Sequence, residues 1–194
     1  MIQSRFTKMA FASMLIGSSL MAGYTYNANS LLAVEGGYTY ATADTTAVNN
    51  YKSHDSNLAN LGLKIGAETD NYRIFLGARY YYDIDENFDY LDTYGIDIQY
   101  KFNFSRASNF FIGLGGGVAK AKLTFDGENF DRRISDGYYN ADLGFNIHMG
   151  DFTDLELGGR YMNIDAHNIK NNTDLHFNGM VTAYASLIFK WKMD

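Results

Sequence analysis

The stretch Tyr72–Asp83, YRIFLGARYYYD, alternates between two kinds of side chain over its whole length. One face would hold Tyr72, Ile74, Leu76, Ala78, Tyr80 and Tyr82, and the other would hold Arg73, Arg79 and Asp83. Successive side chains of a strand point to opposite faces, so the stretch predicts a strand with one apolar and one charged face. Its length is sufficient for a tilted strand, which needs about 9–11 residues to cross the hydrocarbon layer of a membrane.

Seven further stretches repeat this alternation, at residues 31–43, 60–68, 94–104, 110–118, 139–149, 155–161 and 175–191. Beyond residue 30, no stretch has the period of an amphipathic helix over three turns. The chain contains no proline, which would remove a backbone donor from a strand ladder. The sequence therefore predicts an all-β fold, an eight-stranded antiparallel up-and-down transmembrane β-barrel.

The connections between these stretches alternate in length. Residues 70–71, 105–109 and 150–152 predict tight turns, whereas 44–57, 85–91, 124–135 and 163–174 predict longer polar loops. Transmembrane barrels have short turns on the periplasmic side and longer loops outside. Both ends of the barrel domain are therefore expected on the periplasmic side.

Counting outward from each tight turn predicts the register of three hairpins. A one-residue slip would reverse every face, so the register is a strict requirement. The expected neighbours are Ala67 with Ile74 and Glu68 with Arg73; Asp142 with Arg160 and Phe145 with Leu157; and Phe102 with Ile112, Lys101 with Gly113, Gln99 with Gly115 and Asp97 with Gly117.

The distribution of aromatic residues indicates which face is outside. A soluble barrel would place the apolar face inward around a ligand, and this alternative also accommodates the charged face. However, the apolar face carries Tyr72, Phe102, Phe104, Phe110, Phe189 and Trp191 near the turn end, and Tyr40, Tyr80, Tyr82, Tyr94 and Tyr139 near the loop end. Two aromatic girdles that bound an aliphatic band are typical of a membrane interface.

The opposite face is expected to line the lumen with equal numbers of acids and bases. They are Glu35, Glu68, Asp97, Asp142 and Glu156, with Lys64, Arg73, Arg79, Lys101 and Arg160. An eight-stranded barrel is only just wide enough for side chains to fill it. We therefore expect a network of ion pairs that fills the lumen; a gated ion path is the alternative.

The first 22 residues resemble a secretory signal peptide. Arg5 and Lys8 supply the positive region, an apolar stretch follows, and Leu20, Met21 and Ala22 form the predicted cleavage site before Gly23. The predicted domains are thus a signal peptide, 1–22, and a barrel, 23–194. Residues 23–194 hold 14 basic and 22 acidic side chains, a net charge of −8 that argues against nucleic-acid binding. The absence of cysteine excludes disulfides and thiolate metal sites.

The alternating strands and the terminal stretch LIFKWK, which includes Phe189 and Trp191, resemble the OmpA/OmpX/opacity-type family of small outer-membrane barrels. The chain departs from the family pattern by continuing to Met193 and Asp194. The resemblance implies a monomer at the cell surface, in the outer membrane of a Gram-negative bacterium. Its implied partners are outer-membrane lipids, lipopolysaccharide, the barrel-assembly machinery and an extracellular ligand of the four loops.

Two short motifs suggest other chemistry but fit it poorly. Asp83, Asp85, Asn87 and Asp89 resemble a calcium loop, yet Phe88 replaces the required glycine. His54, Ser56 and Asn57 resemble a lipid A deacylase motif, but Glu68 would lie roughly 40 Å from Ser56 along one strand. His148, His167 and His176 share no metal-ligand spacing.

We therefore expect no catalytic residue, cofactor or metal, and a structural or surface-interaction role rather than an enzyme. A narrow passive channel is the alternative, and a lipid A-modifying enzyme is the third candidate.

Overall fold

A computed structural model describes residues 28–47, 50–84, 88–123, 132–164, 168–170 and 173–192. The strands are β1 (Asn29–Ala47), β2 (Asn50–Glu68), β3 (Tyr72–Asp83), β4 (Phe88–Asn103), β5 (Ser108–Leu123), β6 (Arg132–Gly150), β7 (Thr153–Ile164), β8 (Asn168–Lys170) and β9 (Thr173–Lys192). Within these ranges, the structure contains no helix of the length and apolarity needed to span a membrane. The predicted signal peptide lies outside the described residues.

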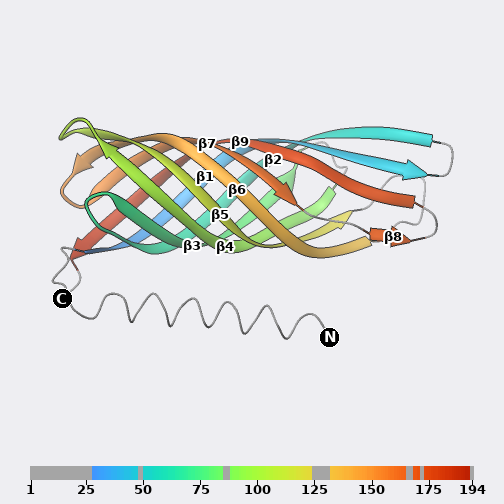
Figure 1. The fold of residues 1–194 in the computed structure, drawn as a ribbon, viewed down its shortest axis with the longest axis horizontal. Coiled ribbons are helices and arrows are strands. Elements are labelled where there is room, and N and C mark those ends of the chain that lie inside the picture. The colour runs from blue at the N-terminus through green and yellow to red at the C-terminus, as the bar shows by residue number, and fades with distance from the viewer. Residues whose placement is uncertain are drawn as a thin grey trace.

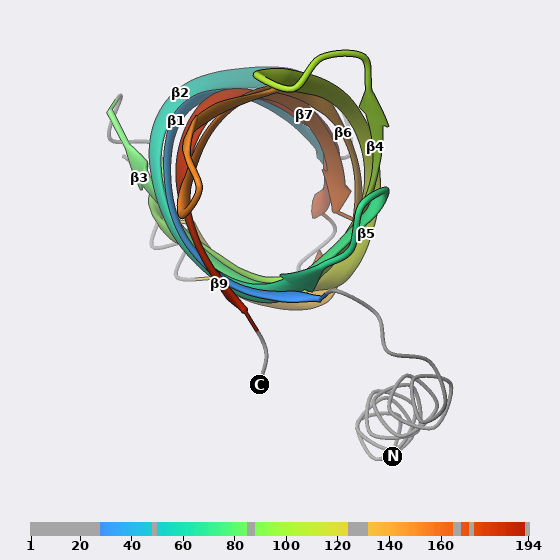
Figure 2. The same ribbon diagram turned by 90° about the vertical axis from the view of Figure 1, so that its left-hand side faces the viewer.

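Eight of the strands close into an antiparallel barrel (Figures 1 and 2). Each strand from β1 to β6 pairs with the next, β7 pairs with β9, and β9 pairs back with β1. The three-residue β8 pairs only with β9 and lies outside this ring. The predicted eight-stranded up-and-down barrel is therefore confirmed, and closure leaves its wall without unpaired edges.

Two of the three predicted hairpin registers are confirmed. Glu68 lies opposite Arg73, and Asp142 lies opposite Arg160. The third is wrong by two residues, because the chain turns about Arg106 and Lys101 pairs with Phe111 instead of Gly113. Likewise, Phe102 pairs with Phe110, Gln99 with Gly113 and Asp97 with Gly115. A shift of two preserves the faces, so the prediction of which side chains point inward still holds for this hairpin.

The apolar face lies on the outside of the barrel. Large hydrophobic side chains such as Leu63, Ile98 and Leu143 are more than half exposed, whereas every predicted lumen charge is at most 6% exposed. A soluble barrel would have the reverse arrangement, with an apolar lumen around its ligand. The structure therefore excludes that alternative.

The strands extend further than predicted at the loop end (Figure 1). Most of the predicted loop 44–57 is strand, because β1 and β2 pair as far as Ala47 and Asn50. Parts of the predicted loops 85–91, 124–135 and 163–174 are also strand, in β4, β6, β7, β8 and β9. Polar composition suggested loops there, but pairing with neighbouring strands overrides that preference.

Together, β1, β2, β8 and β9 form a sheet that continues beyond the point where β2 stops pairing with β3, at Leu58. The β1–β9 register shifts between Thr42 and Ala43, opposite Gly179. Gly179 has φ 131°, a conformation that L side chains rarely adopt. The resulting β-bulge bends β9 at the base of this outer sheet.

Candidate functional site in the barrel lumen

The ten predicted charges come from six different strands and converge in the lumen. They lie on β1 (Glu35), β2 (Lys64, Glu68), β3 (Arg73, Arg79), β4 (Asp97, Lys101), β6 (Asp142) and β7 (Glu156, Arg160). Figure 2 shows the backbone of the ring end-on. The ten charged side chains are buried in the space that this ring encloses. Each charge is held there by the inward parity of its strand.

Glu35 is the acceptor for three basic side chains. Arg160 binds it through both terminal nitrogens, at 2.7 and 3.0 Å. Lys64 lies 3.0 Å from it, and the Arg79 Nε donates to it at 3.1 Å. Arg79 also binds Asp97, and the Arg160 Nε donates to Asp142 at 2.9 Å. A bidentate guanidinium–carboxylate contact fixes orientation as well as distance.

Arg73 has the complementary role and binds three acids. Its Nη2 lies 2.9 Å from Glu68 and 3.2 Å from Asp154, and its Nη1 lies 3.1 Å from Glu156. Glu68 also accepts from Lys101 at 2.8 Å. Lys64 lies 3.1 Å from Glu156 and so joins the group around Arg73 to the group around Glu35. All ten charges therefore belong to one continuous set of ion pairs, the lumen network.

The lumen network includes two charges that the sequence analysis missed. Asp154 is fully buried and accepts from Lys190 at 2.8 Å as well as from Arg73. Asp154 has the same inward parity as Glu156, but it lies next to the predicted turn and was therefore not assigned to the strand. Lys190 lies within LIFKWK, a stretch that was interpreted from its aromatic residues alone. The inward position of Lys190 was therefore not predicted. These two add one acid and one base, so the balance of charge is unchanged.

Glycines on β5 make room for the network. Gly115 lies between Asp97 on β4 and Asn140 on β6. A Cβ atom at this glycine would lie 2.6 Å from the Asn140 side-chain oxygen and would also collide with Asp97. The inward face of β5 at this height is therefore free of side chains because the network occupies the space.

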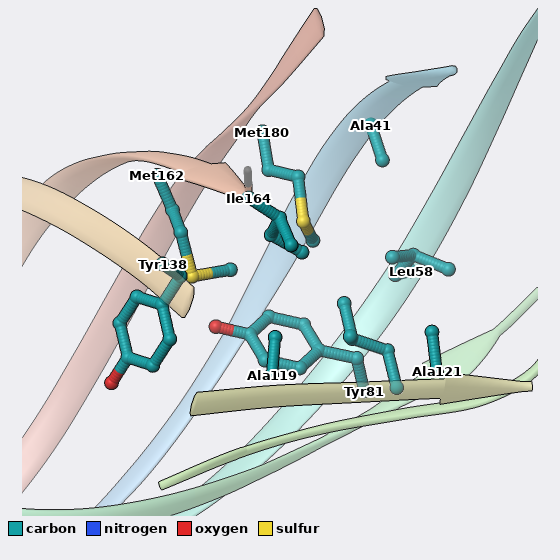
Figure 3. Packing of buried hydrophobic residues seen from close by; sticks show 10 residues of the cluster. Ala41, Leu58, Tyr81, Ala119, Ala121, Tyr138, Met162, Ile164 and Met180 are labelled. Atoms are coloured by element: carbon teal, nitrogen blue, oxygen red, sulfur yellow. The ribbon is translucent and has the colours of Figure 1, made fainter. Parts of the chain in front are cut away.

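A hydrophobic layer, in which the buried side chains of Ser56 and Asp83 also lie, occupies the lumen between the network and the loop end (Figure 3). All eight barrel strands contribute to it. Its buried residues are Ala41, Leu58, Tyr81, Leu91, Ala119, Ala121, Tyr138, Met162, Ile164 and Met180. A smaller group near the turn end consists of Leu31, Ala33, Phe75 and Ile188. The sequence predicts a polar lumen and neither of these groups, although Tyr81 and Phe75 have the inward parity of Arg79.

The predicted girdle residues lie on the barrel exterior. Tyr72, Tyr80, Tyr82, Phe102, Phe104, Phe189 and Trp191 are 40–64% exposed, and Phe110 is half-buried. Tyr72, Tyr100, Phe102, Phe110 and Phe145 form a continuous row of ring contacts near the turn end, with centroids 4.7–5.9 Å apart. This row crosses β3, β4, β5 and β6.

Only parts of the two weaker motifs lie within the described residues, and those parts form no site. Ser56 is buried in β2, and Glu68 lies at the far end of that strand, bound to Arg73 and Lys101. The side chain of His54 and residues 85–87 of the calcium-like loop lie outside the described residues. Within the described part of the chain, no cluster of His, Cys, Asp or Glu is suited to a metal ion.

The sequence matches no protein-family model and no curated protein. In contrast, the structure resembles several solved barrels. Neisserial surface protein A (NspA) superposes with a TM-score of 0.60 at 15% identity, over 82% of this chain and 97% of that chain. Outer membrane protein OprG from Pseudomonas aeruginosa gives 0.54 at 12% identity, over 87% and 98%.

The N-terminal β-barrel domain of Pseudomonas aeruginosa OprF gives a TM-score of 0.53 at 15% identity, over 84% of this chain and 97% of that domain. At such low identity the likeness concerns the fold. The chain therefore has the fold of the small outer-membrane β-barrels.

Proposed function

We propose that this protein is a closed, non-conducting barrel of the bacterial outer membrane that acts through its outer sheet. The main observation in support is that side chains fill the lumen, where the network and the hydrophobic layer follow one another along the barrel axis. Among the described residues, the network satisfies buried charges with one another, which leaves no row of unpaired charges for a passing ion. The hydrophobic layer adds a constriction lined mainly by apolar side chains, and hydrophobic constrictions block ions by excluding water.

The exterior supports placement in a membrane. Exposed side chains such as Leu61, Leu114 and Val181 make up a wall that would be a large apolar patch on a soluble protein. A lipid-facing Arg or Lys would cost about 2–4 kcal/mol at the bilayer midplane, and within the aliphatic band the strands keep their charges inside. The likeness to OprG, an outer membrane protein by name, supports the same compartment.

The outer sheet supports a role at the cell surface. It continues β1, β2 and β9 beyond the rest of the wall (Figure 1) and is rich in Thr, Asn and Asp. Polar segments carried on a rigid barrel are where binding residues concentrate. With the lumen closed, this sheet and the connections beside it are the parts of the molecule available to a ligand outside the cell.

Solute flux into proteoliposomes tests the proposal. Vesicles that contain the purified protein should take up small sugars and ions no faster than protein-free vesicles. A variant with an opened lumen, Glu35→Ala with Arg160→Ala and Met180→Ala, provides the matched comparison because it removes parts of both layers. Rapid uptake through the unmodified protein would overturn the closed-barrel proposal and favour the narrow channel.

A further inference from the structure

A chain of hydrogen bonds leads from His148, at the turn end of the lumen, to Arg73. The His148 Nδ1 lies 2.7 Å from an Asp154 carboxylate oxygen, and its Nε2 lies 3.2 Å from the Asn109 amide nitrogen. The Asn109 side-chain oxygen accepts from the Asn146 amide at 2.8 Å. The Asn146 side-chain oxygen in turn accepts from the Arg73 Nη1 at 3.1 Å.

The geometry of this chain fits one tautomer of His148. A carboxamide nitrogen can only donate, so the Asn109 nitrogen requires that Nε2 be an unprotonated acceptor. The single ring proton must then lie on Nδ1, where it is donated to Asp154. The geometry therefore fits the Nδ1–H tautomer of His148, and each amide in the chain has one orientation that satisfies both of its neighbours.

We propose that protonation of His148 reverses this chain and loosens Arg73. A proton from solvent added at Nε2 would place two donors face to face, so Asn109 must turn its oxygen toward the ring. Its nitrogen then faces the nitrogen of Asn146, which must turn as well. The Asn146 nitrogen finally faces the Arg73 Nη1, and Arg73 loses that acceptor. Histidine is the side chain suited to such a switch, because its charge ordinarily changes between pH 5 and 8.

The charged groups around His148 would also loosen Arg73 when the ring is protonated. Asp154 already accepts from Lys190 on β9 and from Arg73 on β3. Protonated His148 would be a third cation on this one carboxylate and would compete with Arg73 for it. On the β5 side, Asn109 faces the ring, and the Ala107 carbonyl accepts the backbone N–H of His148.

The position of His148 gives solvent protons access. Its side chain is 26% exposed, whereas Asp154, Asn146 and Asn109 are buried. The proton is therefore taken up at the turn-end rim, and its effect is carried inward by amide rotations. Arg73 keeps Glu68 and Glu156, so the network is loosened at one end and not dismantled.

Side-chain NMR of the intact protein in nanodiscs tests the switch. At neutral pH, the imidazole ¹⁵N shifts should show Nδ1–H, and on acidification the Asn146 and Asn109 amide signals should move with the same midpoint as the ring. In Asn109→Asp, the carboxylate can accept from Nε2–H and from Asn146, so the Asn146 signals should stay fixed while the ring titrates. In His148→Phe, the amide signals should not move in that pH range.

An Nε2–H tautomer at neutral pH would overturn the proposal. So would Asn146 signals that stay fixed while His148 titrates in the unmodified protein. Movement of the Asn146 signals in His148→Phe would also overturn the proposal. If Asn109→Asp fails to fold, the comparison between His148→Phe and the unmodified protein still tests it.

Discussion

Asp142 on β6 and Arg160 on β7 lie directly opposite one another and form an ion pair of 2.9 Å. Arg160 also binds Glu35 on β1, which is separated from β7 by β9 alone. The guanidinium of Arg160 therefore connects Asp142, on the other strand of its own hairpin, to Glu35 on β1, where the barrel closes against β9. This makes Arg160 a junction of the lumen network.

Removing either partner should destabilise the barrel unequally. Arg160→Ala leaves two acids without their guanidinium, and we expect a loss of about 3–5 kcal/mol. Asp142→Ala should cost less, because Arg160 keeps Glu35. The double variant should lose clearly less than the sum, as measured by urea unfolding in lipid vesicles.

Asp70 in the β2–β3 turn provides the control for this cycle. Its side chain is exposed, and it is not one of the residues that form the lumen network. The losses for Asp70→Ala and Asp142→Ala should add. Additive losses for Asp142 and Arg160 would contradict the contact between them.

Gly158 should not tolerate a methyl group. A Cβ atom there would lie 2.5 Å from the Tyr184 ring carbon Cζ and 2.6 Å from its hydroxyl oxygen. Tyr184 is 5% exposed and cannot easily move away. We expect Gly158→Ala to cost about 1–3 kcal/mol in the free energy of unfolding.

Gly150 offers the matched control, because a Cβ atom there would meet nothing within 4 Å. Gly150→Ala should have a much smaller effect on the urea midpoint. Equal losses for the two variants would show that the packing of Tyr184 against Gly158 is unimportant.

The alternation of side chains predicted the fold and the inward set, because parity is a local property of the chain. Glu68 and Arg73 could be placed opposite each other since their turn is short. The contact between Arg160 and Glu35 could not be predicted, because it depends on how the closed barrel staggers its strands. Asp154 was not predicted because it lies beside a turn. The hydrophobic layer was not predicted because apolar residues such as Met180 occupy inward positions on a mostly polar face, and they leave the alternation of the strand unchanged.

Labelling of single cysteines should establish the orientation. The chain has no cysteine, so each variant carries one thiol. On intact cells, Asn50→Cys should react with a membrane-impermeant maleimide, because Asn50 lies at the tip of the outer sheet. Ala107→Cys, in the β4–β5 turn, should react only after the outer membrane is opened. The reverse pattern would invert the proposed topology.

The N-terminus of the membrane-inserted protein tests the proposed export route. Because the predicted cleavage site, Leu20 to Ala22, lies directly before Gly23, mass spectrometry of the protein purified from outer membranes should find a chain that begins at or near Gly23. The ion for the Met1 peptide should be confined to precursor in the cytoplasm. A membrane-inserted chain that retains Met1 would contradict cleavage.

Single-channel recording in planar bilayers tests the closed lumen most directly. The purified protein, with insertion verified by its resistance to protease, should show no unit conductance in 1 M salt at either polarity. The variant that combines Glu35→Ala, Arg160→Ala and Met180→Ala should conduct, because it opens both the network and the hydrophobic layer. Stable, reproducible conductance steps from the unmodified protein would contradict the account.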